Sequence, residues 1–147
     1  MEKNQAWLLL DNQLCFKLYS ASKAMTNAYR SFLVPLDLTY SQYLVMLVLW
    51  EKDDISVKEL GEKVGLDSGT LSPLLKKLQT KKIILKSREQ SDERVITIKL
   101  TKKGSDLKKE AMKIPAELLK KIGLNVKEVS ELRKKLEVLV ENLDQIN

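Results

Sequence analysis

The chain has 147 residues, of which 44% are hydrophobic and 31% are charged, and its formal net charge is +6. This composition is typical of a folded globular protein of ordinary domain size and excludes an intrinsically disordered chain. Histidine is absent and cysteine occurs once, which argues against an intrachain disulfide, a histidine-based metal site and a Cys–His or Ser–His catalytic pair.

The first third of the chain predicts two helices. Apolar residues recur at spacings of three and four over 11–33, which favours an amphipathic helix with Asp11 or Asn12 as its N-cap and an end before Pro35. The segment 37–50, "DLTYSQYLVMLVLW", predicts a second helix that is capped near Thr39 and apolar almost all round. Such a helix belongs in the middle of a core.

Two short helices joined by a tight turn follow. The first, over 55–66, has Ser56 as its cap and Gly65 as its C-terminal stop. The second, over 67–82, is expected to become regular close to Gly69 or Thr70, because Pro73 is tolerated only near a first turn. Its inner face is expected to carry four leucines, Leu71, Leu74, Leu75 and Leu78.

The hydrophobic period then changes from that of a helix to that of a strand. Segments 83–87 and 95–100 predict two strands, since apolar residues alternate with Thr97 and Lys99 in the second. The loop 88–94 between them is polar, charged and too long for a tight hairpin turn.

Two more helices complete the pattern. The first covers 101–122, with a bend expected at Pro115, and the second covers 126–143. Leucine and valine residues in the second recur at alternating spacings of three and four, and this heptad-like seam requires another helix against it. Packing within one chain and closure of a dimer are both compatible with the seam.

Basic residues concentrate in one part of the chain. Residues 73–104 contain ten lysines and arginines against three acidic residues, so this segment carries +7 and the remainder is close to neutral. A solvated basic face without a partner and a module that binds a polyanion both fit this charge.

Two short helices followed by a basic ribbon describe a winged helix-turn-helix, in a fold that is mainly α with a small β-wing. The second helix of such a unit enters the major groove, with its early residues nearest to the bases. Free N–H groups at its start would favour a phosphate. We therefore predict base contacts from Ser68, Gly69, Thr70 and Ser72, and backbone contacts from Lys76 and Lys77.

The loop 88–94 would be the wing. An arginine at its tip fits the narrow minor groove of A·T-rich DNA, with Arg94 as the first candidate and Arg88 as the second. Asp92 lies two residues before Arg94 and is expected to hold its guanidinium in position. The alternative is a surface ion pair of little energetic value.

The segments "ELGEKVGLDSGTLSPLLKKL" and "DERVITIKLTKKG" strongly resemble the MarR family of bacterial transcriptional regulators. The signature of that family has an aspartate and an arginine separated by one residue, then a strand ending Leu-Thr and a glycine three residues on. Here those residues are Asp92, Arg94, Leu100, Thr101 and Gly104. The resemblance extends over essentially the whole chain and implies a triangular homodimer that binds double-stranded DNA at a pseudo-palindromic operator.

The resemblance also implies how one domain, 1–147, is organised. Residues 37–103 would form the winged helix-turn-helix part that binds DNA. Residues 5–36 and 104–147 would form the helical dimerisation part, in which the first helix and the last two interlock.

Within that family, "LCFKLY", "LTYSQYLVMLVLW" and "LDSGTLSPLLKKL" are similar to the peroxide-sensing branch, which includes the organic-hydroperoxide regulator OhrR and SarZ-type regulators. Members carry a reactive cysteine near the start of the first helix and tyrosines that hydrogen-bond it. The resemblance implies that Cys15 is the sensing thiol, that Tyr29 and Tyr40 hold its thiolate, and that Tyr19 lines the same pocket. The alternative is that Cys15 is buried and inert and the tyrosines only pack.

The chemistry requires a thiolate, because the thiolate and not the thiol attacks a peroxide. Phenol hydroxyl groups and the positive end of a helix both stabilise that charge. Cys15 and Tyr29 are fourteen residues apart, so along one straight helix they lie about 21 Å apart and can meet only across two subunits. Sulfenic acid is the expected first product, and without a second cysteine a low-molecular-weight thiol would cap it or the acid would overoxidise.

These features predict a repressor of peroxide-detoxification genes that releases DNA when an organic hydroperoxide oxidises Cys15. Three alternatives remain open: a related regulator gated by a small aromatic ligand, a basic helical adaptor for acidic proteins or membrane surfaces, and a thiol peroxidase. No apolar run spans a bilayer, and the N-terminus makes a poor signal peptide. We therefore expect a cytoplasmic protein that is not an enzyme and carries no cofactor or metal.

Overall fold

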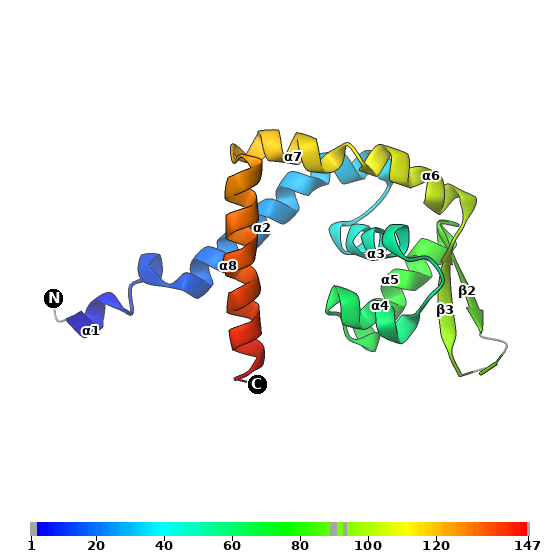
Figure 1. Cartoon of the computed structure of the whole chain (residues 1–147), viewed down its shortest axis with the longest axis horizontal. Helices are drawn as coiled ribbons and strands as arrows, with labels where there is room; N and C mark the ends of the chain where they lie inside the picture. The colour runs from blue at the N-terminus through cyan, green and yellow to red at the C-terminus, as the bar shows by residue number, and fades with distance from the viewer. Residues whose placement is uncertain (1–2, 89–90, 93, 147) are drawn as a thin grey trace. The chain divides into compact units, whose positions relative to one another are not determined.

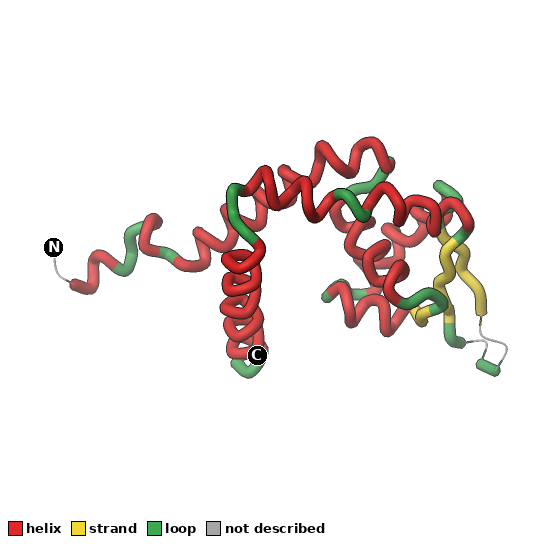
Figure 2. Tube along the Cα trace, turned by 45° about the horizontal axis from the view of Figure 1, so that its top comes forward, coloured by secondary structure: helices red, strands yellow, loops and turns green. Residues whose placement is uncertain are grey.

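The computed structural model describes residues 3–88, 91–92 and 94–146 (Figure 1). Within these residues the fold is mainly α with one small antiparallel sheet, as the sequence predicts, and Figure 2 shows β2 and β3 of that sheet side by side. The chain separates into two compact units, Met1–Met112 and Lys113–Asn147.

The first unit holds, in chain order, α1 (Lys3–Ala6), η1 (Leu10–Asn12), α2 (Leu14–Leu33), η2 (Val34–Leu36), α3 (Tyr40–Glu51), β1 (Ile55–Ser56), α4 (Val57–Val64), α5 (Ser68–Thr80), β2 (Ile84–Arg88), β3 (Ile96–Leu100) and α6 (Lys102–Ala111). The second unit holds α7 (Ile114–Ile122) and α8 (Val126–Asp144).

Helix α2 begins later than the sequence predicts. It starts at Leu14, and its N-cap residue Gln13 makes no side-chain capping bond. Asp11 and Asn12 lie instead in the 3₁₀ turn η1, where the Asn12 side chain donates a hydrogen bond to the Ala6 carbonyl over 2.8 Å. The expected caps are wrong, because a contact with the preceding turn competes for the same side chain.

Helix α3 forms the centre of the core of the first unit. Pro35 lies in the 3₁₀ turn after α2, as predicted. Thr39 and Gln42 then form a capping box, in which each side chain accepts a hydrogen bond from the backbone amide of the other, over 3.0 and 3.3 Å. The buried side chains of α3 are Gln42, Tyr43, Val45, Met46, Leu49 and Trp50. The prediction that this helix lies in the core is confirmed.

Helices α4 and α5 form the helix-turn-helix. Ser56 caps α4 by accepting a backbone hydrogen bond over 3.1 Å, and Gly65 ends the helix with a left-handed φ of 66°. Helix α5 begins at Ser68, slightly before the expected start, and Pro73 lies beyond its first turn. Because proline lacks an N–H, the carbonyl of Gly69 loses its helical partner there. Of the inner leucines, Leu71, Leu75 and Leu78 are buried and Leu74 is half-buried.

The sheet has three strands in the order β1-β3-β2. Strands β2 and β3 confirm the predicted ribbon, with Ile84 opposite Leu100 and the two strands antiparallel. Strand β1 pairs Ile55 with Ile98 and is absent from the sequence prediction, because two residues are too few to show an alternating pattern.

Thr101 and Gly104 join the sheet to α6. The Thr101 hydroxyl accepts a hydrogen bond from the Gly104 amide over 3.1 Å and donates one to the Lys82 carbonyl over 2.7 Å. A Cβ atom on Gly104 would lie 2.3 Å from the Ile83 carbonyl oxygen. The Trp50 indole N–H donates to the Gly104 carbonyl over 2.9 Å. The threonine and glycine of the signature are therefore a packing requirement of this junction.

The second unit contains α7 and α8. The sequence predicts one helix over 101–122, but the structure has two. Helix α6 ends at Ala111, and α7 begins at Ile114, just before Pro115. Helix α8 starts with a capping box between Asn125 and Glu128 and has no buried residue in the part of the chain that is described. Of its seam leucines, Leu132, Leu136 and Leu143 are exposed and Leu139 is half-buried.

No single helix within the described ranges is long and apolar enough to cross a membrane. The segments Leu14–Leu36 and Tyr40–Glu51 reach that length and composition only together, and they are bent by 71° at the break between them.

Replacing Gly104 by alanine is expected to destabilise the first unit, because the new Cβ would overlap the Ile83 carbonyl oxygen. Overpacking of this kind costs about 1–3 kcal/mol, so the urea midpoint should fall while the m-value stays unchanged. Ser105→Ala changes an exposed residue of the same helix and should leave the midpoint in place. Equal midpoints for Gly104→Ala and the parent chain would show that the junction tolerates a side chain.

Candidate functional site

Cys15 is exposed in the first turn of α2. Backbone amides in the first turn of a helix lack intrahelical partners, and the helix dipole favours a negative charge near them. Lys17 pairs with Asp11 over 3.6 Å, and both side chains are exposed. In the single chain the Cys15 thiol is therefore accessible, and it lies near the amide end of the α2 dipole.

Tyr29 and Tyr40 come together near the other end of α2. Their ring centroids are 5.1 Å apart, and Tyr43 extends the contact with its ring 5.5 Å from that of Tyr29. Trp50 follows with its ring 6.2 Å from that of Tyr43. We call these four residues the aromatic row. The structure thus brings together two of the three tyrosines that the sequence analysis places in the sensor pocket.

The third tyrosine, Tyr19, is separate from that row. It lies four residues after Cys15, on the same face of α2, and its ring is exposed beneath the Lys23 ammonium, 5.7 Å from the centroid. Helix α2 is unbroken between Cys15 and Tyr29, so these residues are about 21 Å apart within one chain. The predicted pocket residues therefore form two groups, Cys15 with Tyr19 and Tyr29 with Tyr40.

Burial changes the ionisation of two tyrosines of the aromatic row, Tyr29 and Tyr43. It raises the pKa of Tyr29, and the neighbouring Tyr40 adds to the rise. Burial raises the pKa of Tyr43 to about 12, with further contributions from Tyr29 and Tyr40. The Tyr29 and Tyr43 phenols are therefore protonated at neutral pH, and a protonated phenol can donate a hydrogen bond to an anion.

Tyr43 is the member of the row that the sequence analysis does not single out as a pocket residue. It follows Tyr40 by three residues in "YSQY", a spacing that places two side chains on neighbouring positions of one helix face. Its side chain is 2% exposed and contacts Tyr29 and Trp50 on either side. Tyr43 therefore supports the ring of Tyr29 from within the core.

The outer face of α5 is polar and exposed, as predicted. The exposed residues include Ser68, Gly69, Thr70, Ser72, Lys76 and Lys77. Asp67 caps the helix, with its carboxylate accepting hydrogen bonds from the Thr70 amide and hydroxyl, both over 2.9 Å. These bonds lower the pKa of Asp67. The Thr70 amide is therefore already bonded to a carboxylate, and the phosphate contact expected at this helix start stays a prediction.

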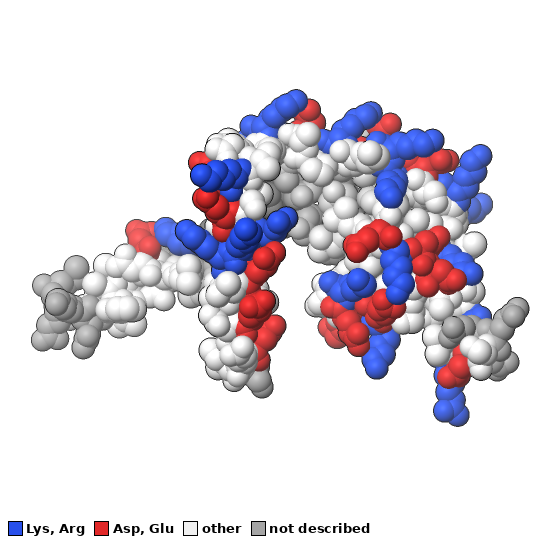
Figure 3. All heavy atoms as spheres, viewed as in Figure 1, with Lys and Arg blue, Asp and Glu red and all other residues white. Residues whose placement is uncertain are grey.

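The described residues of the wing loop are exposed. Arg88 ends β2, and Asp92 accepts a hydrogen bond from the backbone amide of Arg94 over 2.9 Å. Asp92 therefore shapes the turn through the backbone of Arg94 rather than through its guanidinium, as asparagine and aspartate do in Asx turns. Residues 89, 90 and 93 of the predicted wing lie outside the described residues. On the face shown in Figure 3, Lys and Arg side chains stand over α6 and at the end of the wing.

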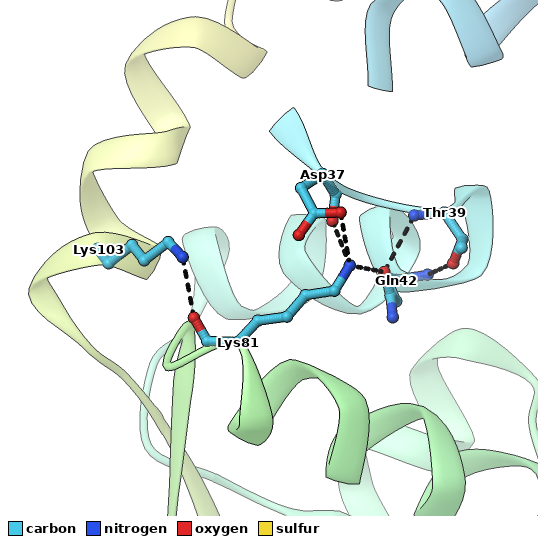
Figure 4. Close-up of polar contacts among 5 residues, drawn as sticks. All are labelled: Asp37, Thr39, Gln42, Lys81 and Lys103. Carbon is cyan, nitrogen blue, oxygen red and sulfur yellow. Dashed lines mark hydrogen bonds and ion pairs between the residues drawn. The ribbon is translucent and has the colours of Figure 1, made fainter. Parts of the chain in front are cut away.

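Lys81 ties the end of α5 to the corner that precedes Tyr40 (Figure 4). Its ammonium pairs with the Asp37 carboxylate over 3.1 Å, donates to the Asp37 carbonyl, and lies 3.5 Å from Gln42 Oε1. Lys103 donates to the Lys81 carbonyl over 2.9 Å. We call Asp37, Gln42, Lys81 and Lys103 the Lys81 cluster. It connects α5, the corner before α3, and α6.

Across the ranges that the structure describes, no group of three or more His, Cys, Asp or Glu side chains is arranged to hold a metal ion.

Comparisons with known proteins agree on the class of protein. Residues 28–111 match a family described as transcriptional regulator SarA/Rot. The chain is 41% identical over 147 residues to the organic hydroperoxide resistance transcriptional regulator of Bacillus subtilis, covering 100% of both chains. It is 40% identical over 138 residues to the HTH-type transcriptional regulator SarZ of Staphylococcus saprophyticus, covering 94% of each.

The fold of this chain also matches that of a solved structure. Reduced AbfR bound to DNA superposes with a TM-score of 0.79 and 31% sequence identity, covering 97% of this chain and 99% of that chain. AbfR, from Staphylococcus epidermidis, has also been solved in an overoxidised form bound to DNA and in a disulfide form. The winged helix-turn-helix arrangement is thereby confirmed.

Replacing Tyr43 by phenylalanine is expected to reduce the loss of stability at alkaline pH. Folding raises the pKa of this phenol from 10.0 to about 12, so its contribution to stability is complete below pH 10 and is lost as the pH rises through about 12. Urea midpoints measured over this range should therefore fall more steeply for the parent chain than for Tyr43→Phe. Tyr19→Phe, at an exposed ring, should follow the parent. Parallel curves for all three chains would contradict the assignment.

Proposed function

The chain belongs to the SarA/Rot family of winged-helix transcriptional regulators, and we propose that it is a cytoplasmic, homodimeric repressor that releases its operator when an organic hydroperoxide oxidises Cys15. The observation that carries this proposal is the exposed Cys15 thiol in the first turn of α2. The name of the Bacillus subtilis relative and the reduced and overoxidised states of AbfR support a cysteine as the trigger.

The proposed reaction begins with the Cys15 thiolate. It attacks the terminal oxygen of the hydroperoxide, which forms a sulfenate and releases an alcohol. Phenol hydroxyls that donate to the sulfur favour the thiolate over the thiol. Tyr29 and Tyr40 are the donors that we propose, because their rings lie together and Tyr29 is protonated at neutral pH.

The proposed donors come from a second copy of the chain. Within one chain α2 holds Cys15 about 21 Å from Tyr29. Large apolar side chains are exposed along the surfaces that a second copy would cover, among them Leu14, Met25, Leu132, Leu136 and Leu143. Exposed apolar area of this kind marks an interaction surface, which supports a homodimer with two sensor sites.

DNA binding is proposed to use α5 and the wing of each subunit. Ser68, Gly69, Thr70 and Ser72 face the bases, Lys76 and Lys77 face phosphates, and Arg88 and Arg94 reach the minor groove, with Asp92 fixing the backbone of Arg94. Two reading helices related by a two-fold axis require a pseudo-palindromic duplex whose half-sites are about one helical turn apart.

The oxidised sulfur requires a partner from outside the chain. The sequence has no second cysteine, so we propose that a low-molecular-weight thiol caps the sulfenic acid and that further peroxide overoxidises it in the absence of such a thiol. The capped or oxidised side chain then displaces the two subunits and releases DNA. The protein acts as a stoichiometric sensor and not as an enzyme.

Replacing Cys15 by serine is expected to preserve operator binding and abolish its loss in cumene hydroperoxide, because serine cannot form the sulfenate. Fluorescence anisotropy of a labelled operator, with peroxide and a small thiol, measures both properties. Ser22→Ala alters an exposed residue of the same helix and should respond like the parent. If Cys15→Ser still releases the operator in peroxide, the thiol is not the trigger.

Mixed dimers test whether the thiol and the phenols come from different subunits. Cys15→Ser dimers should lack the sensing thiol, and Tyr29→Phe/Tyr40→Phe dimers should oxidise slowly. A mixed dimer of the two chains contains one complete site, made by Cys15 of one copy and the phenols of the other. Rapid oxidation of the single remaining thiol, followed by intact mass, is the expected result. Oxidation as slow as in the double-tyrosine variant would place the phenols in the same subunit as the thiol.

A further inference from the structure

Helix α5 contains a backbone carbonyl whose helical partner is missing. In an α-helix each carbonyl accepts a hydrogen bond from the amide four residues later. The residue four positions after Gly69 is Pro73, which has no N–H. Pro73 lies beyond the first turn of α5, so its N–H is not one of those that a helix start leaves unpaired in any case. The Gly69 carbonyl oxygen therefore lacks the bond that continues the helix.

This carbonyl lies on the outer face of α5. Gly69, Ser72 and Pro73 are exposed, whereas Leu71 and Leu75 are buried on the opposite side. Carbonyls on the solvent side of a helix tilt outward, and a proline ring pushes away the carbonyl four residues before it. Glycine has no side chain that would keep another molecule from the oxygen. The oxygen is thus open to a hydrogen-bond donor from outside the chain.

Helix stability does not explain the proline. Glycine and proline have the lowest helix propensities of all residues, and α5 contains one of each. Gly69 has a local reason, because a Cβ atom there would lie 3.1 Å from Oδ1 of Asp67, the residue that caps the helix. Pro73 is exposed, so its ring fills no gap in the core. It weakens the helix without a gain in packing, which indicates a role on the outer face.

A hollow of about 360 Å³ continues along the outer face from Pro73. Lys76, Lys77, Thr80 and Lys81 line the rest of it. Lysines beside the open carbonyl attract a polyanion to this face, and contacts with phosphates fix the position of a duplex against it. The carbonyl and the lysines are therefore presented to the same partner.

We propose that the Gly69 carbonyl, left open by Pro73, accepts a hydrogen bond from a base in the major groove and selects adenine or cytosine at one position of each half-site. This inference rests on the proposed function, because it requires α5 to enter that groove. A carbonyl oxygen only accepts hydrogen bonds. In the major groove adenine N6 and cytosine N4 are donors, whereas guanine and thymine present acceptors that repel the oxygen. The contact thus distinguishes amino bases from keto bases on one strand.

Duplexes that lack a single amino group test this contact. The parent chain first selects a preferred duplex from a random pool. Each adenine of one half-site is then replaced by purine and each cytosine by 2-pyrimidinone, one base at a time. The Kd is measured by fluorescence anisotropy at one salt concentration, because phosphate contacts make affinity depend on salt. At one position the parent should bind about tenfold more weakly, the factor that loss of one hydrogen bond implies.

Pro73→Ala supplies the amide that bonds the Gly69 carbonyl, so the penalty at that position should largely disappear. Both proteins are measured with the same analogue, so any weakening of base pairing cancels in the comparison. The urea midpoint of Pro73→Ala should rise, because alanine has the higher helix propensity. A purely structural proline would change stability without changing the dependence on the amino group. Gln79→Ala, at an exposed position of the same helix, should keep the parent pattern.

The outcomes separate this inference from the proposed function. If the parent prefers no duplex over random DNA, the proposed function fails and this inference fails with it. If a duplex is preferred but the loss of amino groups affects the parent and Pro73→Ala equally at every position, the carbonyl does not read a base and the proposed function stands. A penalty that is confined to one position and is lost in Pro73→Ala establishes the contact.

Discussion

The length of one unbroken helix is the constraint on which the proposed sensor depends. Helix α2 carries Cys15 in its first turn and Tyr29 in its second half, and a rise of about 1.5 Å per residue keeps the two apart. No change of side-chain rotamer removes that separation. A sulfur that is stabilised by these phenols therefore requires two copies of the helix side by side. In the proposed homodimer, sensing and self-association use the same surface, and each site needs residues from both subunits.

The corner between α2 and α3 connects the phenols to the end of α5 and to the start of α6. The aromatic row begins at Tyr40, passes through the core, and ends at Trp50, whose indole holds the Gly104 carbonyl at the start of α6. The Lys81 cluster leaves the same corner and reaches the end of α5. The first path consists of packed rings and a hydrogen bond to a backbone carbonyl, and the second consists of an ion pair and hydrogen bonds. In the proposed sensor, a displacement of the phenols would act on α5 and on the base of the wing through these contacts.

The features predicted most accurately from the sequence are those that depend on contacts between residues close together in the chain. Thr39 and Gly65 mark helix ends correctly, because each satisfies backbone groups or conformations within one turn. The prediction of Asn12 as a helix cap is wrong, because its side chain bonds the nearby Ala6 carbonyl instead. The contact of Lys81 with Asp37 joins residues 44 positions apart, and no local pattern predicts it. At the candidate site, the family resemblance supplies Cys15 and its tyrosines, whereas Tyr43 becomes apparent only from ring contacts in the folded core.

The aromatic row also gives the molecule an optical property. The chain has two tryptophans, and they occupy opposite environments: Trp7 is 79% exposed, whereas Trp50 is 9% exposed and packs edge-on against Tyr43. Trp50, which is shielded from water beside the Tyr43 ring, emits at shorter wavelength. Trp7 emits at longer wavelength from water. The intrinsic fluorescence of the unlabelled protein therefore contains separate signals from the N-terminal segment and from the core beside the phenols.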